Sequence, residues 1–272
     1  MFQWIAKDIL DANVDRLQDS FQKAHPFRHL VIDELVEKDS LIPLLKAFPE
    51  SSWSGWENVS HEHQHLKQVC NDISIIPDPL RTLIYELNSG PFLNWLSKVT
   101  GIPQILPDPH LFGGGLHSTG PGGTLTPHTD FHVVKGLPLF RRLNLLFYLN
   151  SDWTEENGGM LELWHKNQDR IEKIVLPTLG TCVLFQTDND SMHGFTTPVS
   201  SKNRQSVAIY YYTASDAEQF SGDGVTYWRS QSAANDSSSW LRLQAQRTLL
   251  FGARVASGLS WRFGMMAEKT RK

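Results

Sequence analysis

The stretch RRLNLLFYLN, Arg141–Asn150, alternates between two kinds of side chain. One parity holds Arg142, Asn144, Leu146 and Tyr148, and the other holds Leu143, Leu145, Phe147 and Leu149. Because successive side chains of a strand point to opposite faces, the pattern predicts a strand with an apolar face for core packing and a more polar face turned to an interior. A Tyr148 hydroxyl buried in that interior needs a hydrogen-bond partner, and a bound carboxylate would supply one.

Other short apolar runs follow Pro103 and are separated by turn residues. They are HLFGGGLHST, GGTLTPHTD, GGMLELWHK, IEKIVLP, GTCVLFQ, MHGFTT and RQSVAIYYYT. With the first stretch they make about eight strands at even spacing, which is typical of a β-sandwich or barrel. A double-sheet jelly roll of the cupin kind closes eight strands naturally. The sequence therefore predicts a mainly β protein with flanking helices.

The flanking regions have helical spacing. Residues 1–103 predict a helical or mixed support region, 104–217 the β core, and 218–272 a C-terminal helical extension, all within one structural unit. In the first region we expect helices over residues 1–24, 39–48 and 79–101, the last broken at Gly90-Pro91, a strand near residue 30, and an irregular stretch over 51–78. The extension is rich in Arg and Lys, and we expect it to cap the barrel. A helix lying on a membrane surface is the alternative.

Composition narrows the classes of function. The chain has 272 residues, of which 40% are hydrophobic, and a net charge of −4. The length and hydrophobic fraction are enough for one hydrophobic core, and the slightly negative charge does not favour a nucleic-acid partner. The two cysteines, Cys70 and Cys182, exclude a disulfide scaffold and fit a cytoplasmic location. We expect neither a signal peptide nor a transmembrane helix, because no run of 18 apolar residues occurs.

Three residues of the predicted core form a candidate metal site. His128 and Asp130, in TPHTDFH, are two apart and share one face of the predicted strand, and His193 follows in SMHGF. Two histidines and one carboxylate are the facial ligand set of non-heme Fe(II) oxygenases, which leaves open coordination positions for other ligands. The sequence therefore predicts an iron site.

A second constellation lies in RQSVAIYYY. Arg204 and Ser206 share one face of this strand, and the small Ala208 follows on the same face. An arginine can grip a carboxylate through two parallel hydrogen bonds, and the serine hydroxyl can add another donor. A dicarboxylic co-substrate could chelate iron at one end and meet Arg204 at the other.

Taken together, residues of about 110–214 resemble the prolyl-4-hydroxylase-like group of Fe(II)/2-oxoglutarate-dependent oxygenases. The resemblance rests on the HxD pair, FYLNSDW followed by ENGGMLELW, HGFTTPV and RQSVAIYYY, in this order. It implies a double-stranded β-helix with Fe(II) at His128, Asp130 and His193. It further implies O₂ and 2-oxoglutarate as co-substrates, with ascorbate as an optional reductant. The distal carboxylate of 2-oxoglutarate would meet Arg204 and Tyr148. The resemblance also places Ser206, Asn144 and Leu161 beside 2-oxoglutarate, on weaker grounds. Asp130 argues against the related halogenases, which have Gly or Ala at this position.

The primary substrate stays open, because fold and co-substrate chemistry do not determine it. A small molecule, a peptide or a glycolipid headgroup is admissible. Arg142 could hold an anionic substrate group or form a salt bridge at a strand start, and His117 and His132 could line the pocket or be structural. The histidines of HEHQH, residues 61–65, predict a solvated loop rather than a metal site. Two rivals are a metal-dependent cupin enzyme and a jelly-roll binding module, neither of which would use 2-oxoglutarate.

Overall fold

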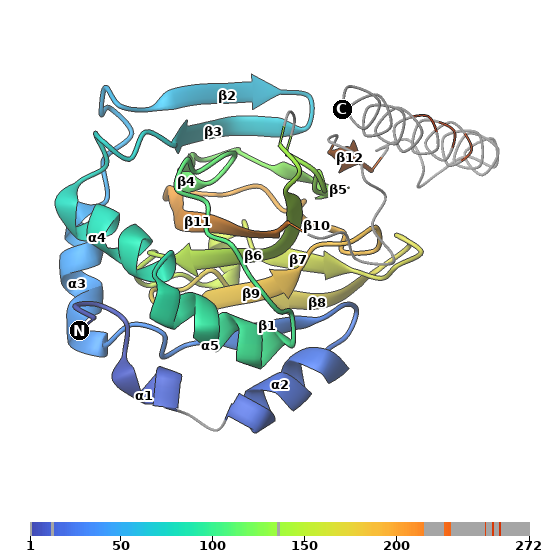
Figure 1. Ribbon diagram of the computed structural model, residues 1–272. Coiled ribbons are helices and arrows are strands. Elements are labelled where there is room, and N and C mark those ends of the chain that lie inside the picture. Colours follow the sequence, from blue (N-terminus) through green and yellow to red (C-terminus); the bar gives the residue numbers. More distant parts are fainter. Residues whose placement is uncertain are drawn as a thin grey trace, which may run out of the picture.

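The computed structural model describes residues 2–11, 14–134, 137–214 and 226–229, with the single positions 248, 252 and 256. Within its continuous described segments, the α-helices lie in the first hundred residues, where helical spacing predicted them (Figure 1). They are α1 Lys7–Asp11, α2 Val14–Lys23, α3 Lys38–Ala47, α4 Asp78–Leu87 and α5 Gly90–Thr100, and a 3-10 turn, η1, follows later at Glu155–Asn157. Gly90 and Pro91 begin α5, so the predicted break in the helical stretch is confirmed.

Strands fill the rest of the described chain. They are β1 His29–Ile32, β2 Glu57–His61, β3 Gln64–Cys70, β4 Gly115–Thr119, β5 Leu125–Thr129, β6 Phe140–Tyr148, β7 Leu161–Trp164, β8 Ile171–Val175, β9 Cys182–Gln186, β10 His193–Phe195, β11 Arg204–Thr213 and β12 Tyr227–Trp228. Each of the eight predicted core runs overlaps one of the strands β4–β11. The sheet order is β1-β9-β6-β11-β4-β3-β5-β10-β7-β8, and all the pairs are antiparallel. This sheet curls over itself into the predicted jelly-roll barrel.

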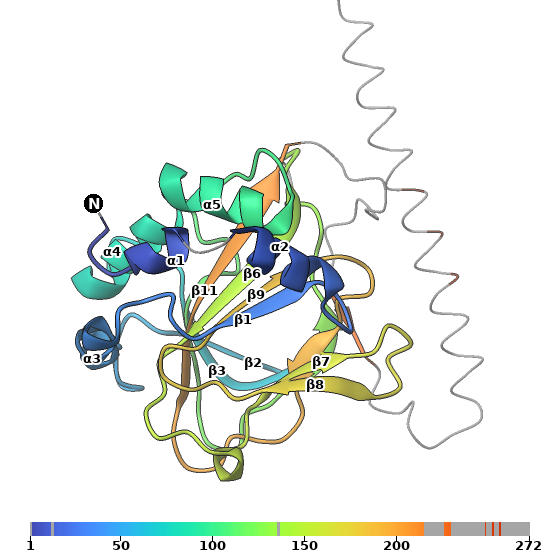
Figure 2. The ribbon, with the colours of Figure 1, turned by 90° about the horizontal axis from the view of Figure 1, so that it is seen from below.

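The helices cover the outer face of the sheet half that contains β1, β9, β6 and β11 (Figures 1 and 2). Leu143, Leu145, Phe147 and Leu149 are buried there in one apolar cluster with helix residues such as Phe92 and Leu83. The alternation in Arg141–Asn150 predicted this apolar face. The opposite parity of β6 faces the barrel interior, where Tyr148 packs with Leu161 and Phe185 from other strands. The layer of helices therefore fixes the strands that carry the interior side chains.

The N-terminal region contributes strands as well as helices to the barrel. β1 was predicted, and it pairs with β9 along four residues. The prediction of an irregular stretch over residues 51–78 is wrong for residues 57–70, because β2 and β3 form a hairpin there and β3 pairs with β4. The side chains of this hairpin are largely polar and half exposed, so they lack the apolar alternation that identifies a strand in sequence. Lys67 on β3 thereby comes beside Thr119 on β4.

A β-bulge in β6 reverses the expected orientation of two neighbouring arginines. Leu143 pairs with Tyr211 and Arg141 pairs with Tyr212, so Arg142 is an extra residue in the register with β11. Arg141 is therefore buried on the interior side, at 1% exposure, while Nη1 of Arg142 donates to Oγ1 of Thr213 at 3.3 Å. The prediction that Arg142 shares the inward face of Asn144 is wrong, because a bulge shifts side-chain parity by one residue.

The C-terminal part of the chain is described only in short pieces. β12 pairs with β5, so Tyr227 and Trp228 extend the half of the sheet that carries the HxD pair. The predicted helical extension, with its basic residues and its membrane alternative, falls outside the described residues. The division at 103 and 217 stays a prediction, although strands from before residue 103 and after residue 217 join the same sheet. Among the described residues, none of the helices is both long enough and apolar enough to cross a bilayer.

Candidate active site

His128, Asp130 and His193 meet inside the barrel. His128 and His193 are cross-strand partners on β5 and β10, and Asp130 lies one residue past the end of β5. Nε2 of His128 lies 3.6 Å from Oδ1 of Asp130, and Nε2 of His193 lies 3.5 Å from Oδ2. One donor atom from each residue lies within 4.8 Å of the others, and this is the only such group found among the described residues. The sequence-predicted iron ligands are therefore together in space.

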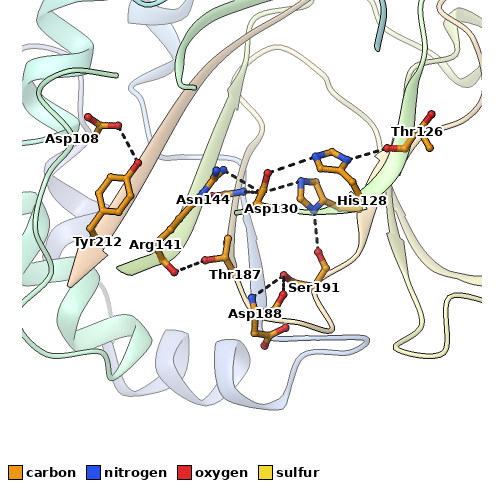
Figure 3. Close-up of polar contacts among 11 residues, drawn as sticks. Asp108, Thr126, His128, Asp130, Arg141, Asn144, Thr187, Asp188, Ser191 and Tyr212 are labelled. Atoms are coloured by element: carbon orange, nitrogen blue, oxygen red, sulfur yellow. Dashed lines mark hydrogen bonds and ion pairs between the residues drawn. The ribbon is translucent and has the colours of Figure 1, made fainter. Parts of the chain in front are cut away.

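Hydrogen bonds from the far side of each imidazole orient the two histidines (Figure 3). Nδ1 of His128 lies 2.9 Å from the Thr126 carbonyl oxygen, and Nδ1 of His193 lies 3.0 Å from that of Ser191. A proton on Nδ1 leaves the lone pair of Nε2 for a metal, as is usual for metal-binding histidines. Burial, together with the neighbouring His128, lowers the pKa of His193 to about 4, so this imidazole is neutral at physiological pH. The donor set thus fits a divalent transition metal such as Fe(II).

Asp130 is held by two polar side chains of β6. Nη2 of Arg141 and Nδ2 of Asn144 both donate to its Oδ2 atom, at 3.1 and 2.7 Å (Figure 3). Burial alone would raise the pKa of this carboxyl, but Arg141, His193 and His128 outweigh it and hold the pKa well below its usual range. Asp130 is therefore ionised, as a metal ligand must be. Asn144 lines the cavity as expected, but its amide group is engaged with Asp130 rather than directed to a carboxylate clamp.

Arg204 begins β11, the strand that pairs with β6, and it lines the cavity at 7% exposure. Its Nε donates to the Gly159 carbonyl oxygen at 2.6 Å, and its Nη2 donates to the Tyr148 hydroxyl at 3.0 Å. The guanidinium also stacks over the rings of Phe195 and Tyr148, at 4.5 and 4.8 Å from their centroids. Among the described residues, no hydrogen bond is found to Nη1, so this nitrogen can still donate to a carboxylate. The geometry fits the anion-binding role predicted for Arg204 and Tyr148.

The metal-binding group and Arg204 share one cavity of about 190 Å³. Ser206 and Leu161 line it, as predicted for residues beside the co-substrate, and His117 lines it as well. Burial, reinforced by Lys67, holds the pKa of His117 well below its ordinary value, so this histidine is neutral. Neither His132 nor Arg142 lines the cavity, although His132 is fully buried.

The cavity residues that sequence reasoning missed include Arg141, Lys67 and Trp228. Arg141 is adjacent to the residue that strand parity favoured, and only the bulge reveals it. Lys67 comes from β3, which has no apolar alternation. Strand pairing places Lys67 level with Arg204, because both residues pair with Thr119, from opposite sides of β4. Burial lowers the pKa of Lys67 to about 8, against the attraction of Asp130.

The HEHQH segment lies beside this cavity, whose lining includes Gln64 and Trp228. His61 ends β2, His63 lies in the hairpin turn, and the His63 ring stacks on Trp228 at 4.8 Å and 9°. Trp228 in turn lies against His128. No further metal-binding group includes these histidines within the part of the chain that the structure describes. The segment is part of a hairpin rather than a simple solvated loop.

Comparison with known proteins agrees with this geometry. Residues 114–254, more than half of the chain, match the family described as the 2OG-Fe(II) oxygenase superfamily. Mouse prolyl 3-hydroxylase OGFOD1 is 26% identical over 193 residues, which cover 69% of this chain and 33% of the mouse protein. The chain thus spans about a third of the length of that relative.

Solved structures share the fold at low sequence identity. A prolyl-4-hydroxylase from Pseudomonas putida superposes with a TM-score of 0.52 at 13% identity, covering 72% of this chain and 98% of the bacterial one. A prolyl hydroxylase from Trichoplax adhaerens, in complex with a hypoxia inducible factor peptide fragment, gives a TM-score of 0.51 at 16% identity, covering 75% and 95%. The double-stranded β-helix, the facial donor set and the family match all agree. The chain belongs to the 2OG-Fe(II) oxygenase superfamily.

Proposed function

We propose that the protein is an Fe(II)- and 2-oxoglutarate-dependent dioxygenase that hydroxylates a C–H bond of a peptide substrate at a prolyl residue, with conversion of 2-oxoglutarate to succinate and CO₂. The observation that carries the proposal is the shared cavity, in which a facial metal-binding group stands opposite a buried arginine with a nitrogen available for a carboxylate. A cupin enzyme or binding module that does not use 2-oxoglutarate would have no need of this arginine.

We assign the individual steps to side chains of this chain. His128, Asp130 and His193 would hold Fe(II) on one side and leave its other positions to 2-oxoglutarate and O₂. When bound, the metal supplies the activation of O₂, with 2-oxoglutarate as the source of electrons. Arg204 and Tyr148 would anchor the distal carboxylate and so orient the co-substrate. The apolar side chains of Leu146, Leu161 and Phe195 line the same cavity and limit the access of water.

The choice of a peptidyl prolyl substrate is supported by the relatives. A prolyl hydroxylase is the curated relative at 26% identity, and prolyl hydroxylases are among the proteins of similar fold. A small molecule or a glycolipid headgroup is the alternative that the sequence leaves open. We further propose a cytoplasmic location, which is supported by two buried cysteines without a disulfide bond.

The proposal is tested by coupled turnover. Purified protein is incubated with Fe(II), ascorbate, 2-oxoglutarate and O₂, with and without a panel of proline-containing peptides. We expect one or more peptides to increase succinate formation and to gain the mass of one oxygen atom, located on proline by fragmentation. His193→Ala should abolish both signals. Stimulation by small molecules or glycolipids alone would overturn the peptide assignment, and 2-oxoglutarate turnover that no added substrate increases would overturn the choice of panel.

A further inference from the structure

We infer that Arg141 and Asn144 are positioning residues that determine which oxygen atom of Asp130 is offered to the metal. The inference rests on the proposed metal site and adds a function for two residues that touch neither substrate nor co-substrate in the scheme above. It assigns Oδ1 of Asp130 as the metal ligand and Oδ2 as the oxygen that anchors the carboxylate to the protein.

The hydrogen bonds on Asp130 are unevenly distributed. Both the Arg141 and the Asn144 donor end on Oδ2 (Figure 3). Each oxygen lies near one imidazole, Oδ1 at 3.6 Å from Nε2 of His128 and Oδ2 at 3.5 Å from Nε2 of His193, so the two oxygens differ in their hydrogen bonds and not in their distance from the histidines. An oxygen that accepts two strong hydrogen bonds, one of them from a cation, has less electron density to give to a metal. Oδ1 is therefore the better donor of the two.

The three side chains form a closed arrangement. Nε of Arg141 donates to Oδ1 of Asn144 at 2.8 Å, while Nη2 of the same guanidinium and Nδ2 of the same amide both reach Asp130. Each member is thus held by the other two. This bridging needs the planar fork of an arginine, because a lysine has a single nitrogen that cannot reach both partners in the same way.

Packing immobilises the guanidinium in addition. It lies 3.3 Å from the centroid of the Tyr210 ring and 4.7 Å from that of Phe131, and Arg141 is 1% exposed. A buried, stacked and doubly bonded arginine has little freedom to move. Its position is therefore suited to holding another group in place.

Asp130 needs such support because of its place in the chain. His128 lies within β5 and pairs with β10 and β12, so the sheet fixes its backbone. Asp130 comes one residue after β5 ends, where the ladder of β5 does not hold it. Contacts from behind a metal ligand typically change metal affinity 10- to 100-fold. The Arg141–Asn144 pair thus holds the Asp130 side chain in place of the strand pairing that fixes His128.

The test uses two variants that leave the net charge unchanged, Arg141→Lys and Asn144→Ala. Constant charge matters because removal of a nearby cation would itself favour metal binding and mask the loss of positioning. Arg142→Lys is the matched control, since it is the same substitution one residue away, on the bulge. Mn(II) and Co(II) are titrated into the metal-free protein without 2-oxoglutarate, and the visible spectrum of the Co(II) protein reports the coordination.

We expect Arg141→Lys and Asn144→Ala to weaken Mn(II) binding by about 10-fold or more and to alter the Co(II) spectrum. Arg142→Lys should match the wild type in both measurements. Thermal unfolding of the metal-free proteins separates positioning from general damage, and Asn144→Ala alone decides the matter if Arg141→Lys does not fold. Unchanged Mn(II) affinity and Co(II) spectrum in Asn144→Ala would overturn the inference. These readouts do not need turnover, so they hold even if the proposed prolyl hydroxylation is wrong.

Discussion

Trp228 lies over His128, with 4.6 Å between the ring centroids and 32° between the ring planes. The two residues are also paired in the ladder between β12 and β5. A residue near the end of the described chain therefore contacts a proposed metal ligand directly. The two side-chain rings touch, and the two backbones are neighbours in the sheet.

This contact predicts an optical signal for metal binding. Addition of Co(II) to the metal-free protein should quench part of the tryptophan emission, because an open-shell ion would lie just beyond the ring on which Trp228 packs. Trp228→Phe should lose most of the quenching and retain Co(II) affinity within a few-fold. Quenching that persists undiminished in Trp228→Phe would mean that another tryptophan reports the metal, or that the metal binds elsewhere.

Replacement of any of the three proposed ligands should abolish catalysis without unfolding the protein. We expect His128→Ala, Asp130→Ala and His193→Ala to lose Fe(II)-dependent succinate formation, because each removes one of three ligands of an open site. His65→Ala serves as the control, since His65 is exposed on β3. Circular dichroism checks the fold, and wild-type turnover in all three variants would contradict the assignment.

Loss of the arginine clamp should weaken 2-oxoglutarate binding and leave the metal bound. A charge-assisted contact is worth roughly 1.5–3 kcal/mol, so Arg204→Ala should raise the apparent 2-oxoglutarate constant by about 10- to 100-fold. Arg204→Lys should recover part of the loss, because lysine keeps the charge without the fork. Succinate formation against 2-oxoglutarate concentration measures the constant. No change in Arg204→Ala would place the carboxylate elsewhere.

Gly159 offers an indirect way to disturb the same clamp. Its φ is +62°, and an added Cβ would lie 2.9 Å from Cδ of Arg204 and 3.0 Å from Cγ2 of Val199. Gly159→Ala should therefore push Arg204 aside and raise the 2-oxoglutarate constant, with little effect on Mn(II) affinity. Gly122→Ala controls for backbone strain, because φ there is +86° but the nearest atom lies 3.5 Å away. Equal behaviour of the two variants would mean that strain, and not contact with Arg204, is responsible.

Lys67 predicts a pH dependence for anion binding in the cavity. Burial lowers its pKa to about 8, so its ammonium group is charged below that pH and neutral above it. The cavity thus loses one positive charge as pH rises through about 8, and 2-oxoglutarate affinity for the Mn(II) protein should fall over this range. Lys67→Met should bind more weakly at pH 7 and lose this step, whereas Gln68→Met should not. Calorimetric titration from pH 7 to 9 measures it, and an identical pH profile in Lys67→Met would refute the prediction.

The parts of this structure that could be predicted from sequence are those governed by local pattern. Alternation in Arg141–Asn150 predicts both the strand and its core-facing side, and the spacing of His128 and Asp130 predicts a shared face. Lys67 could not be placed in this way, since its position depends on pairing between β3 and β4 across some fifty residues of intervening chain. The true partner of Asn144 could not be found either, because the Arg141 fork that joins it to Asp130 depends on a bulge.

The bulge at Arg142 also governs how this family should be compared residue by residue. Two adjacent arginines look interchangeable in an alignment, yet only one of them reaches the metal-binding carboxylate. With one arginine deleted, the extra residue would be gone, and the remaining arginine would pair with Tyr212 and face the interior by ordinary alternation. A relative with one residue fewer in this strand could therefore keep the arginine that holds the carboxylate. Correspondence at this point should be judged from strand pairing and not from position in an alignment.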